Sequence, residues 1–493
     1  MSAGAVLFAG CEPEVAAGPD GRILAVGAGA RAAAGRGAEV IRLRGMALPG
    51  LVDSHVHLEG LADDDLTLDV GGAASLEEAL QRVETWALKL PPDAWVVGAG
   101  WYNDLWPNPA FPTRRHLDGA ARGRPVYLER KDGHSAWVSS AALELAGIGP
   151  TSDDPAGGVI DRDGRRRPTG ILRETAMHAV TAILPRAADA DFDAAMAKAL
   201  GGLAEMGITS VHSMDRARGF ASLQRLHAAG RLSIRVTYNL PLADLHYAER
   251  LGVRSGWGDE WLRIWGVKAF LDGSLGSRTA EMLDGSGTSR LPQAELVDMI
   301  DRCVRAELNV CLHAIGDGAV RRALDALARK RDAWRHWRPR IEHAQCVHPK
   351  DVPRFAKIGV IASMQPIHAV ADRELVDRYW SQVATQSYAW GALAQAGAML
   401  AFGSDAPVET ADPLLGIDAA TTWRRRVGWH PELAISRAKA LRAYTVNAAY
   451  AVGMEQHQGS LRFGKLCDLT VVDEDRVVAT IVGGKLSWRR TPR

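Results

Sequence analysis

The stretch MALPGLVDSHVHL (46–58) is an apolar run that ends in the pattern His55-x-His57. Near-continuous apolar runs of this length are typical of parallel strands that are buried on both faces. Side chains alternate along a strand, so both imidazoles point to the same side of it. Two such imidazoles can bind a divalent metal such as zinc, although two histidines satisfied within a core give the same pattern. We therefore expect a buried strand with a histidine pair at its carboxyl end.

Seven further runs of similar character follow along the chain. They are GITSVHSM (207–214), SIRVTYNLP (233–241), LRIWGVKAFLDGS (262–274), NVCLHAIGD (309–317), PRIEHAQCV (339–347), GVIASMQPI (359–367) and AMLAFGSDAP (398–407). Segments with helical spacing precede some of them, at 191–206 and 293–307. Strands that alternate with helices predict a parallel sheet. Eight of them favour an α/β fold of the (β/α)8 TIM barrel type over an open doubly wound sheet, and the first strand lacks the dinucleotide pattern G-x-G-x-x-G.

Both ends of the chain have a different character from the middle. Short apolar runs broken by Gly and Asp occupy residues 1–47, and the tail from Gly459 to Trp488 repeats this pattern. Such runs are typical of strands and turns. We expect one composite β-sandwich domain built from residues 1–47 and 455–493, with two unrelated sheets as the alternative.

About 150 residues separate the first predicted barrel strand from the second, where a barrel normally needs a few tens. This insertion (61–199) contains a helical segment, 75–90, whose Ser75 and Glu78 have capping-box spacing. It also contains strand-like runs at 95–101 and 124–130, and a turn-rich region at 152–170. We expect an insertion subdomain that covers the barrel mouth, which leaves 48–60 and 200–454 for the barrel.

The composition excludes several classes of protein. Of 493 residues, 47% are hydrophobic and 24% charged, with a net charge of +1, which argues against a disordered chain and against a nucleic-acid or membrane partner. The arginine triplets 165–167 and 424–426 are therefore interpreted as solvated surface. The five cysteines are odd in number and lack C-x-x-C spacing, which indicates reduced thiols and a cytoplasmic protein. No apolar run is long enough to span a membrane, and the start lacks the pattern of a signal peptide.

Six polar residues stand towards the carboxyl ends of predicted barrel strands, where such barrels carry their active sites. They are His55, His57, Lys268, His313, His343 and Asp405. As mere core residues they would have to converge by chance, and each buried polar group costs roughly 1–3 kcal/mol if it lacks a partner. A shared metal site is the better explanation, because imidazole and carboxylate groups are ligands of zinc.

Lys268 is the unusual member of this set, because it lies in the apolar run GVKAFLDG (266–273). A buried ammonium group must lose its proton or find a carboxylate. One interpretation is an ion pair with Asp272, four positions on and on the same strand face. The other is a neutral amine that has captured carbon dioxide as a carbamate, an anionic ligand able to bridge two metals. The residues leave both open.

Eight motifs together resemble the amidohydrolase superfamily, and specifically the amidohydrolase 3 family that includes N-substituted formamide deformylases. They are PGLVDSHVHL, RKDGHSAWVSSAAL, GGVIDRDGRRRPTGILRE, VKAFLDGSLGSRTA, LHAIGDGAV, IEHAQ, FGSDAPV and GKLCDLTVVD. They occur in the order that the family shows and span nearly the whole chain. The set is specific for the family and carries no information on the substrate.

The resemblance implies a metal-dependent barrel hydrolase. Its ligands would be His55, His57, Lys268, His313 and His343, with Asp405 as the last ligand and the catalytic proton-transfer residue. It implies a divalent metal, with zinc as the first candidate, and leaves open whether one or two ions bind and whether Lys268 is carbamylated. The implied reaction is hydrolysis of a carbon–nitrogen bond of amide or N-formyl type, in which metal-activated water attacks the carbonyl group.

Two alternatives stay open beside this function. A cyclic-amide hydrolase or a deaminase is compatible with the same scaffold, and a deaminase would commonly use one metal without a carbamate. A non-catalytic regulatory or binding protein that kept the barrel is the third alternative. A homologue that has lost its catalytic activity tends to lose at least one metal ligand, whereas none of the expected metal ligands is missing here.

Five further residues are candidates for substrate contacts. They are Trp101, Tyr102, His134, Arg278 and His368. The two aromatic residues either line an apolar pocket or pack the insertion, and His134 is either a substrate contact or a core histidine. Arg278 follows the fourth barrel strand and suits a carbonyl or carboxylate group. The expected partner is a small molecule with an amide-type bond, and whether the chain forms a homo-oligomer is left open.

Overall fold

The computed structural model describes residues 4–131, 133–334 and 336–491. It divides into two compact units, Met1–Leu61 with Met196–Arg493, and Ala62–Ala195. The second unit lies within the predicted insertion (61–199), whose place over the barrel mouth stays a prediction. Residues 1–3 and 492–493 of the predicted terminal domain lie outside the described residues.

Eight parallel strands form the central sheet of the first unit, in the order β18-β17-β16-β15-β14-β13-β12-β5. Their bounds are β5 Leu51–Val56, β12 Ile208–Ser213, β13 Arg235–Pro241, β14 Leu262–Phe270, β15 Asn309–Ala314, β16 Arg340–His343, β17 Ile361–Met364 and β18 Met399–Phe402. Each lies within one of the eight predicted runs, and neighbours in the sheet are neighbours in the sequence. The predicted (β/α)8 barrel is confirmed.

The loop after β18 meets β5 and brings the two edges of this sheet together. The main-chain N–H of Ser404 donates to Asp53 Oδ1 (3.0 Å), and the Ser404 hydroxyl donates to Asp53 Oδ2 (2.5 Å). A Cβ atom on Gly403 would lie 2.5 Å from the His55 nitrogen, so only glycine permits this approach. The carboxyl end of the first strand is thereby held against the end of the last.

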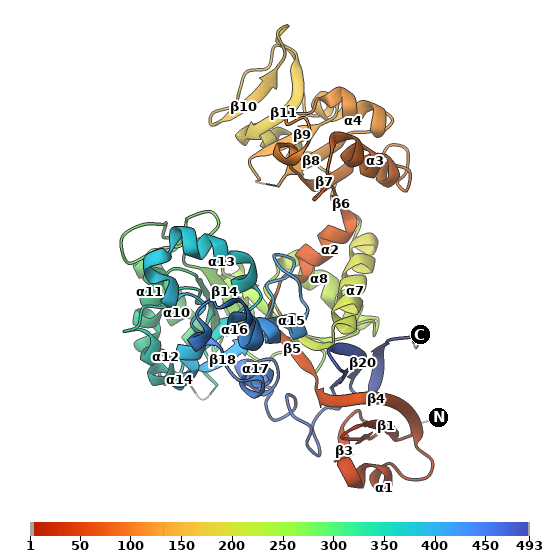
Figure 1. Ribbon diagram of the computed structural model, residues 1–493, viewed down its shortest axis with the longest axis vertical. Coiled ribbons are helices and arrows are strands. Elements are labelled where there is room, and N and C mark those ends of the chain that lie inside the picture. Colours follow the sequence, from red (N-terminus) through yellow and green to blue (C-terminus); the bar gives the residue numbers. More distant parts are fainter. Residues whose placement is uncertain (1–3, 132, 335, 492–493) are drawn as a thin grey trace. The chain divides into compact units, whose positions relative to one another are not determined.

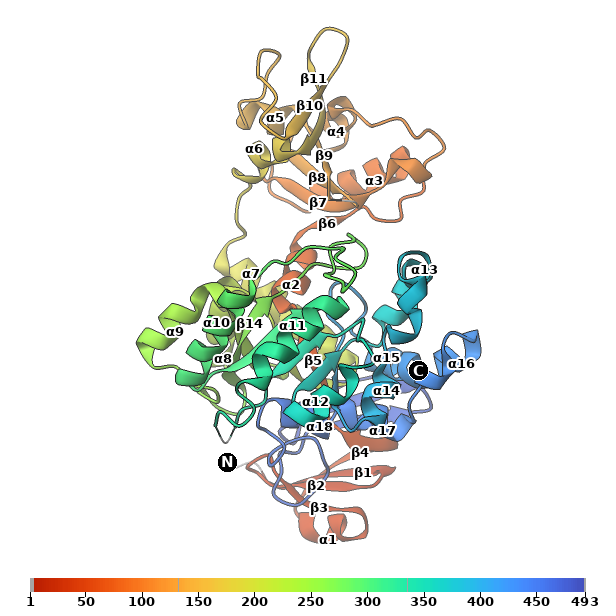
Figure 2. The same cartoon turned by 90° about the vertical axis from the view of Figure 1, so that its left-hand side faces the viewer.

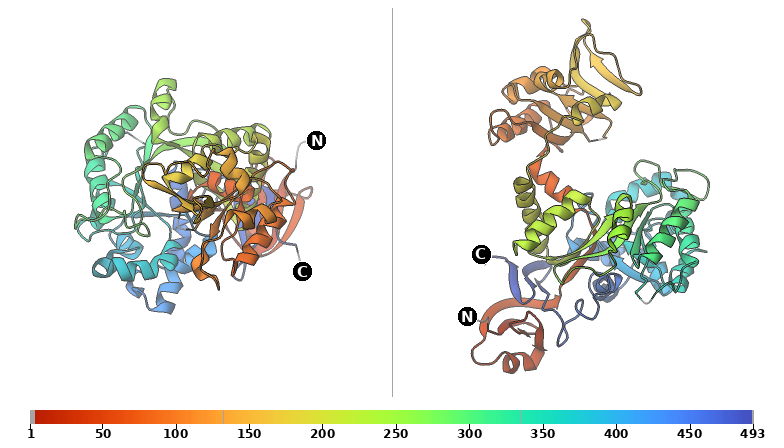
Figure 3. Two further views of the ribbon diagram at one scale, coloured as in Figure 1. Left: turned by 90° about the horizontal axis from the view of Figure 1, so that it is seen from above. Right: turned by 180° about the vertical axis from the view of Figure 1, so that it is seen from behind.

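Helices cover the outside of the strands, and in Figure 2 α10, α11 and α12 lie in front of β14 and β5. The view from above in Figure 3 shows them around the barrel in chain order, from green to blue. Their bounds are α7 Asp189–Glu205, α8 Ala217–Ala228, α9 Leu245–Leu251, α10 Gln293–Arg305, α11 Asp317–Ala328, α12 Val352–Ile358, α13 His368–Tyr379, α14 Trp390–Gln395, α15 Pro413–Asp418, α16 Arg424–Val427, α17 Arg437–Ala443 and α18 Val446–Ala451. The predicted helical segments 191–206 and 293–307 correspond to α7 and α10.

Both ends of the chain share one sheet of seven strands in the order β21-β20-β19-β4-β1-β2-β3, which confirms the composite terminal domain of the predicted fold (Figure 1). The strands are β1 Val6–Glu12, β2 Val15–Ala17, β3 Ile23–Val26, β4 Glu39–Pro49, β19 Leu469–Asp473, β20 Arg476–Val482 and β21 Lys485–Arg489, with α1 at Ala30–Ala34. β19 pairs antiparallel with β4, and Phe8 and Ile481 belong to one buried core.

The second unit contains a mixed sheet of six strands in the order β10-β11-β9-β8-β7-β6. Its elements are β6 Leu68–Asp69, β7 Val96–Trp101, β8 Val126–Arg130, β9 Ser135–Val138, β10 Gly158–Arg162, β11 Pro168–Glu174, α3 Leu76–Ala87, α4 Arg114–Ala120, α5 Ser140–Leu145 and α6 His178–Thr181, and α2 (Leu58–Leu66) leads into it. Ser75 caps α3 by accepting the N–H of Glu78 (3.2 Å), but the Glu78 carboxylate accepts from Ala74 instead of Ser75, so the predicted capping box is half formed.

One arginine triplet differs from its interpretation as solvated surface. Arg424 is fully buried, with its guanidinium 4.3 Å from the ring centroid of Trp390 and 4.6 Å from that of Trp429. These aromatic faces, together with the Tyr388 carbonyl oxygen at 2.9 Å, take the place of water around the cation.

Within the described ranges, every helix is too short or too polar to cross a bilayer.

Candidate metal centre

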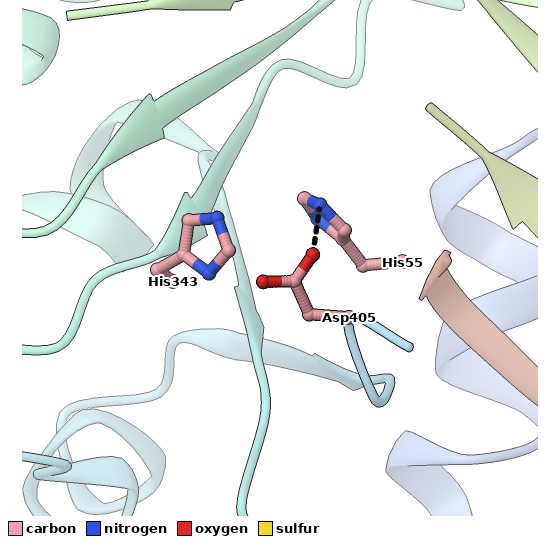
Figure 4. Close-up of side chains that lie close together, drawn as sticks. All are labelled: His55, His343 and Asp405. Atoms are coloured by element: carbon pink, nitrogen blue, oxygen red, sulfur yellow. Dashed lines mark ion pairs between the residues drawn. The ribbon is translucent and has the colours of Figure 1, made fainter. Parts of the chain in front are cut away.

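Three predicted ligands meet at the carboxyl end of the barrel, and we call His55, His343 and Asp405 the central cluster. One ligand atom from each lies within 4.8 Å of the others, and all three residues are buried. Figure 4 shows the two imidazoles and the carboxylate pointing toward one another. They come from β5, the end of β16 and the loop after β18, which the closed sheet brings to one edge.

The other three predicted ligands lie against this cluster. His57 Nε2 is 3.2 Å from Asp405 Oδ1, which itself lies 3.3 Å from His55 Nε2. Lys268 is buried with Nζ 3.2 Å from His55 Nε2. The ring centroid of His313 lies 4.5 Å from that of His343. The structure therefore brings all six residues together at the end of the barrel.

Three histidines of this group have one ring nitrogen within hydrogen-bonding distance of an oxygen acceptor. The pairs are His55 Nδ1 with Glu342 Oε2 (2.7 Å), His343 Nδ1 with Gln365 Oε1 (2.8 Å), and His313 Nε2 with the Gly273 carbonyl oxygen (3.0 Å). A ring hydrogen on that nitrogen would satisfy the acceptor and leave the lone pair on the other nitrogen. Metal-binding histidines have this arrangement, so the residues present fit a metal ion.

The ionisation of the site agrees with this fit. Burial lowers the pKa of His343 well below its usual value and that of His313 to about 3, so both imidazoles are neutral at pH 7. Burial also lowers the pKa of Lys268. Burial by itself would raise the pKa of Asp405, but the facing imidazole of His55 holds it well below its usual range. The neutral imidazoles of His343 and His313 and the ionised carboxylate of Asp405 are forms that coordinate a cation.

The ion pair considered between Lys268 and Asp272 does not form. The Asp272 carboxylate instead accepts the main-chain N–H groups of Ile315 (3.0 Å), Gly316 (2.8 Å) and Glu281 (3.0 Å). The physical reason is that β14 ends at Phe270, so the strand alternation that would place residue 272 on the same face as 268 does not extend that far.

Two site residues have left-handed backbone conformations. φ is 72° at His343 and 63° at Asp405, and Ala344 follows with 43°. Such values are uncommon for residues other than glycine and are concentrated at functional sites. At these positions the chain leaves its strand abruptly, which turns both side chains toward the barrel axis.

Sequence reasoning missed two charged residues beneath the cluster, Arg340 and Glu342. Both are fully buried in β16, and Glu342 contacts His55 directly. The signal was present, because two opposite charges at positions i and i+2 of an apolar strand face the same side and can pair with each other. Only the tertiary structure identifies His55 of β5 as a further partner of Glu342.

Trp101 was predicted either to line an apolar substrate pocket or to pack the insertion, and its burial agrees with the second alternative. The indole is fully buried in the core of the second unit, where Nε1 donates to the Leu128 carbonyl oxygen (2.8 Å). The Trp106 ring packs against it in a tilted arrangement at a centroid distance of 6.5 Å, and the Trp137 ring packs edge-on at 6.0 Å. These three tryptophans therefore form part of a core in the second unit.

Tyr102 and His134 also lie in the second unit. The Tyr102 ring lies 4.6 Å from the Arg130 guanidinium carbon and is half-buried. His134 is exposed, with Nδ1 3.0 Å from Glu174 Oε1, so it is not a core histidine. Their contact with substrate stays a prediction.

His368 and Arg278 belong to the first unit. His368 is buried at the start of α13, with Nε2 3.2 Å from the Ser404 carbonyl oxygen and 3.9 Å from Asp405 Oδ2. Arg278 is exposed and has its guanidinium carbon 5.7 Å from the ring centroid of Tyr379. It lines a cavity of ≈ 680 Å³ together with Leu275, Met282, Trp380 and others.

Comparison with known proteins shows the family to which the chain is similar. A family model described as "Amidohydrolase family" matches residues 39–486. The protein LONG AFTER FAR-RED 3 of Arabidopsis thaliana is 32% identical over 94% of this chain and 87% of its own length. An N-substituted formamide deformylase of Arthrobacter pascens is 28% identical over 96% of this chain and 94% of its own length.

The fold also matches a solved structure over nearly its whole length. The crystal structure of an uncharacterized metal-dependent hydrolase from Pyrococcus furiosus superposes with a TM-score of 0.78. It shares 30% sequence identity and covers 95% of this chain and 98% of that one.

Proposed function

Since the chain belongs to the amidohydrolase family and is a hydrolase, we propose that it cleaves a carbon–nitrogen bond of an amide or N-formyl group. The observation that carries this proposal is the convergence of the His55 and His57 Nε2 atoms on one oxygen of Asp405, at 3.3 and 3.2 Å. An ionised carboxylate beside two imidazoles suits both metal binding and proton transfer. The sequence similarity to a formamide deformylase supports the choice of bond.

The residues that would hold a divalent metal, with zinc as the first candidate, are the six identified above. They are His55, His57, Lys268, His313, His343 and Asp405. Such an ion lowers the pKa of bound water and polarises a carbonyl oxygen. The number of ions is one or two in this proposal.

Asp405 is the proposed proton-transfer residue. Its Oδ1 faces His55 of β5 and His57, which follows this strand, whereas Oδ2 lies 3.9 Å from His368 Nε2. Because its pKa is held low, the carboxylate is free to accept a proton from the attacking water at Oδ2. It then returns that proton to the leaving nitrogen as the carbon–nitrogen bond breaks. Water is consumed, and a carboxylic acid and an amine are released.

We also propose that Lys268 is carbamylated. Its Nζ is fully buried beside His55 Nε2, and burial lowers its pKa, which favours the neutral amine that carbon dioxide requires. The amine nitrogen bonds to the carbon of carbon dioxide and loses one proton. The resulting carbamate is an anion. It would add a negatively charged oxygen ligand beside the histidines.

The cavity lined by Arg278 is the proposed binding region for the substrate's remote end. Gly273 lies within hydrogen-bonding distance of His313 and donates its N–H to the carbonyl oxygen of Thr279 (3.2 Å), so Arg278 belongs to a loop that contacts His313. The acids of the cavity wall are already engaged, since Asp317 accepts the N–H of Leu283 (2.8 Å). Among the described residues, Arg278 makes no ion pair, and it suits a carbonyl or carboxylate group.

The test is a panel of N-formyl amines, linear amides, cyclic amides and amino-heterocycles with protein loaded with Zn²⁺. We expect turnover of a linear amide or N-formyl amine, and a loss of at least about 10²-fold in kcat for Asp405→Asn. The control is Asp259→Asn, which removes an exposed carboxylate paired with His227 (2.8 Å).

The other outcomes of this panel contradict the proposal in distinguishable ways. Ring opening or ammonia release alone would indicate the cyclic-amide hydrolase or the deaminase. Absence of turnover across the panel, with metal bound, would indicate a regulatory or binding protein. Equal kcat for the Asp405→Asn and Asp259→Asn variants would exclude Asp405 from proton transfer.

A further inference from the structure

Glu342 and Arg340 form an ion pair inside the barrel, directly beneath the central cluster. Both side chains have no exposed surface. Arg340 Nε donates to Glu342 Oε1 (2.8 Å), and Nη2 donates to Oε2 (2.9 Å). The same Oε2 accepts the hydrogen of His55 Nδ1 across 2.7 Å. One carboxylate therefore joins an arginine to a candidate metal ligand.

The arginine is itself held by three other strands. Its Nη1 lies 2.8 Å from His212 Nδ1 on β12, and Nη2 donates to Ser363 Oγ on β17 (2.9 Å). Nη2 also donates to the Ser54 carbonyl oxygen on β5. Four strands of the barrel thus define the position of one guanidinium group, and through it the position of the Glu342 carboxylate.

Stability alone does not account for this arrangement. Taking two charges out of water is so unfavourable that buried ion pairs are often no more stabilising than apolar residues of similar size. The pair instead fixes the orientation of the Glu342 carboxylate, because a bidentate arginine fixes the plane of a carboxylate. Both carboxylate oxygens of Glu342 accept from the Arg340 guanidinium, and Oε2 also lies 2.7 Å from His55 Nδ1, so an acceptor oxygen is held in front of this ring nitrogen.

We propose that Glu342 and Arg340 are positioning residues that hold the His55 ring with its hydrogen on Nδ1 and its Nε2 lone pair facing the metal site. This inference rests on the proposed metal centre. It assigns to the pair a direct effect on metal affinity, exerted through His55 and separable from the stability of the fold.

The substitution Glu342→Gln tests the proposal because it keeps the size of the side chain. An amide has one acceptor oxygen, and Arg340 offers only donors, so that oxygen turns to the arginine. The amide NH₂ group then faces His55 Nδ1 and donates to it. The ring hydrogen moves to Nε2, where it blocks coordination.

The matched control is Asp468→Asn, which breaks a second buried bidentate pair in the same unit. Arg235 Nε and Nη2 donate to Asp468 at 2.9 and 3.1 Å, and both side chains are almost fully buried. Asp468 accepts these bonds between the barrel and the terminal sheet, and none of its contacts given by the structure is to the six candidate ligands. Its loss should lower stability while leaving metal affinity unchanged.

The measurement is Zn²⁺ affinity by competition with a chromophoric chelator, together with the absorption spectrum of the Co²⁺-substituted protein and the melting temperature without metal. We expect Glu342→Gln to weaken Zn²⁺ binding by about 10- to 100-fold and to change the Co²⁺ spectrum. We expect Asp468→Asn to lower the melting temperature and to bind Zn²⁺ with the affinity of the unsubstituted chain.

Three results would overturn the inference. Unchanged affinity and spectrum in Glu342→Gln would do so, as would an equal loss of affinity in both variants. If Glu342→Gln does not fold, the ¹⁵N shifts of the imidazoles in the metal-free, unsubstituted protein decide, because a hydrogen on Nε2 of His55 contradicts the proposed role. A chain that binds no Zn²⁺ at all would instead overturn the proposed metal centre.

Discussion

The main-chain N–H of Asp405 donates to the main-chain carbonyl oxygen of His55 across 2.7 Å. This bond joins the loop after the last barrel strand to the first strand, and it places a carboxylate beside a histidine pair. Because the contact is made by backbone atoms, a substitution of the Asp405 side chain leaves it intact. Loss of activity in Asp405→Asn would therefore report on the carboxylate and not on an opened barrel.

Removal of metal is expected to lower stability. A ligand that binds only the folded state, present at 100 times its Kd, contributes about 2.7 kcal/mol. Chelation should lower the melting temperature, and added Zn²⁺ should restore it. His343→Ala should remove most of this Zn²⁺-dependent increment, whereas His227→Ala, at a half-buried histidine paired with Asp259, should keep it. Equal increments in both variants would exclude His343 as a ligand.

The proposed carbamylation of Lys268 predicts that activation depends on bicarbonate. Metal-free protein reconstituted with Zn²⁺ should recover more activity when bicarbonate is present, and ¹³C-labelled bicarbonate should give a carbamate signal in the NMR spectrum. Lys268→Met keeps an apolar chain of similar length in the buried site, so the fold should survive while the signal and the bicarbonate effect disappear. A carbamate signal that persists in this variant would come from another lysine.

Trp101 is predicted to matter for stability and not for substrate binding. Replacing a fully buried tryptophan by alanine costs about 3–5 kcal/mol, and here the bond to the Leu128 carbonyl oxygen is lost too. Trp101→Phe should lose less, because the ring volume is largely kept. Denaturant unfolding measures both. A Trp101→Phe variant with unchanged stability and a raised KM would return this residue to the substrate site.

Arg278 is expected to discriminate between substrates. If its guanidinium binds a carboxylate at the remote end of the substrate, Arg278→Gln should raise KM for acidic substrates by roughly tenfold or more and leave kcat nearly unchanged. Neutral substrates of similar size should be affected little. Arg254→Gln, at an exposed ion pair with Glu307 (3.0 Å), is the control. A uniform rise in KM for acidic and neutral substrates would contradict recognition of charge.

The buried carboxyl group of Asp215 predicts a pH dependence of stability. Burial raises its pKa from 3.8 to about 7, so the folded chain binds a proton that the unfolded chain has released. The stability that this proton provides is present in full below about pH 4 and is lost as the pH rises to about 7. Asp215→Asn lacks this titration. The melting temperature of the variant minus that of the unsubstituted chain should therefore increase as the pH rises from 5 to 8. A constant difference over this range would contradict the raised pKa.

The local pattern of apolar and polar residues was sufficient to predict the barrel architecture. Eight apolar runs separated by helical segments predict eight buried parallel strands, and the period of two predicts that His55 and His57 share one side. The ends of parallel strands lie at one edge, which is why the strand pattern assigns His343 and Asp405 to the same site as His55. The same reasoning failed for the pairing of Lys268 with Asp272, because the strand ends at Phe270.

The sequence by itself therefore determined the order of the strands, the inward side of each and the six polar residues that gather at their ends. Only the tertiary structure decided which acceptors the ring nitrogens of His55, His313 and His343 meet, that Glu342 is the partner of His55 across 287 positions, and that Arg340 pairs with Glu342. The reason is physical. Alternation and apolar runs are properties of neighbouring residues, whereas the partner of a buried charge depends on how the whole barrel closes.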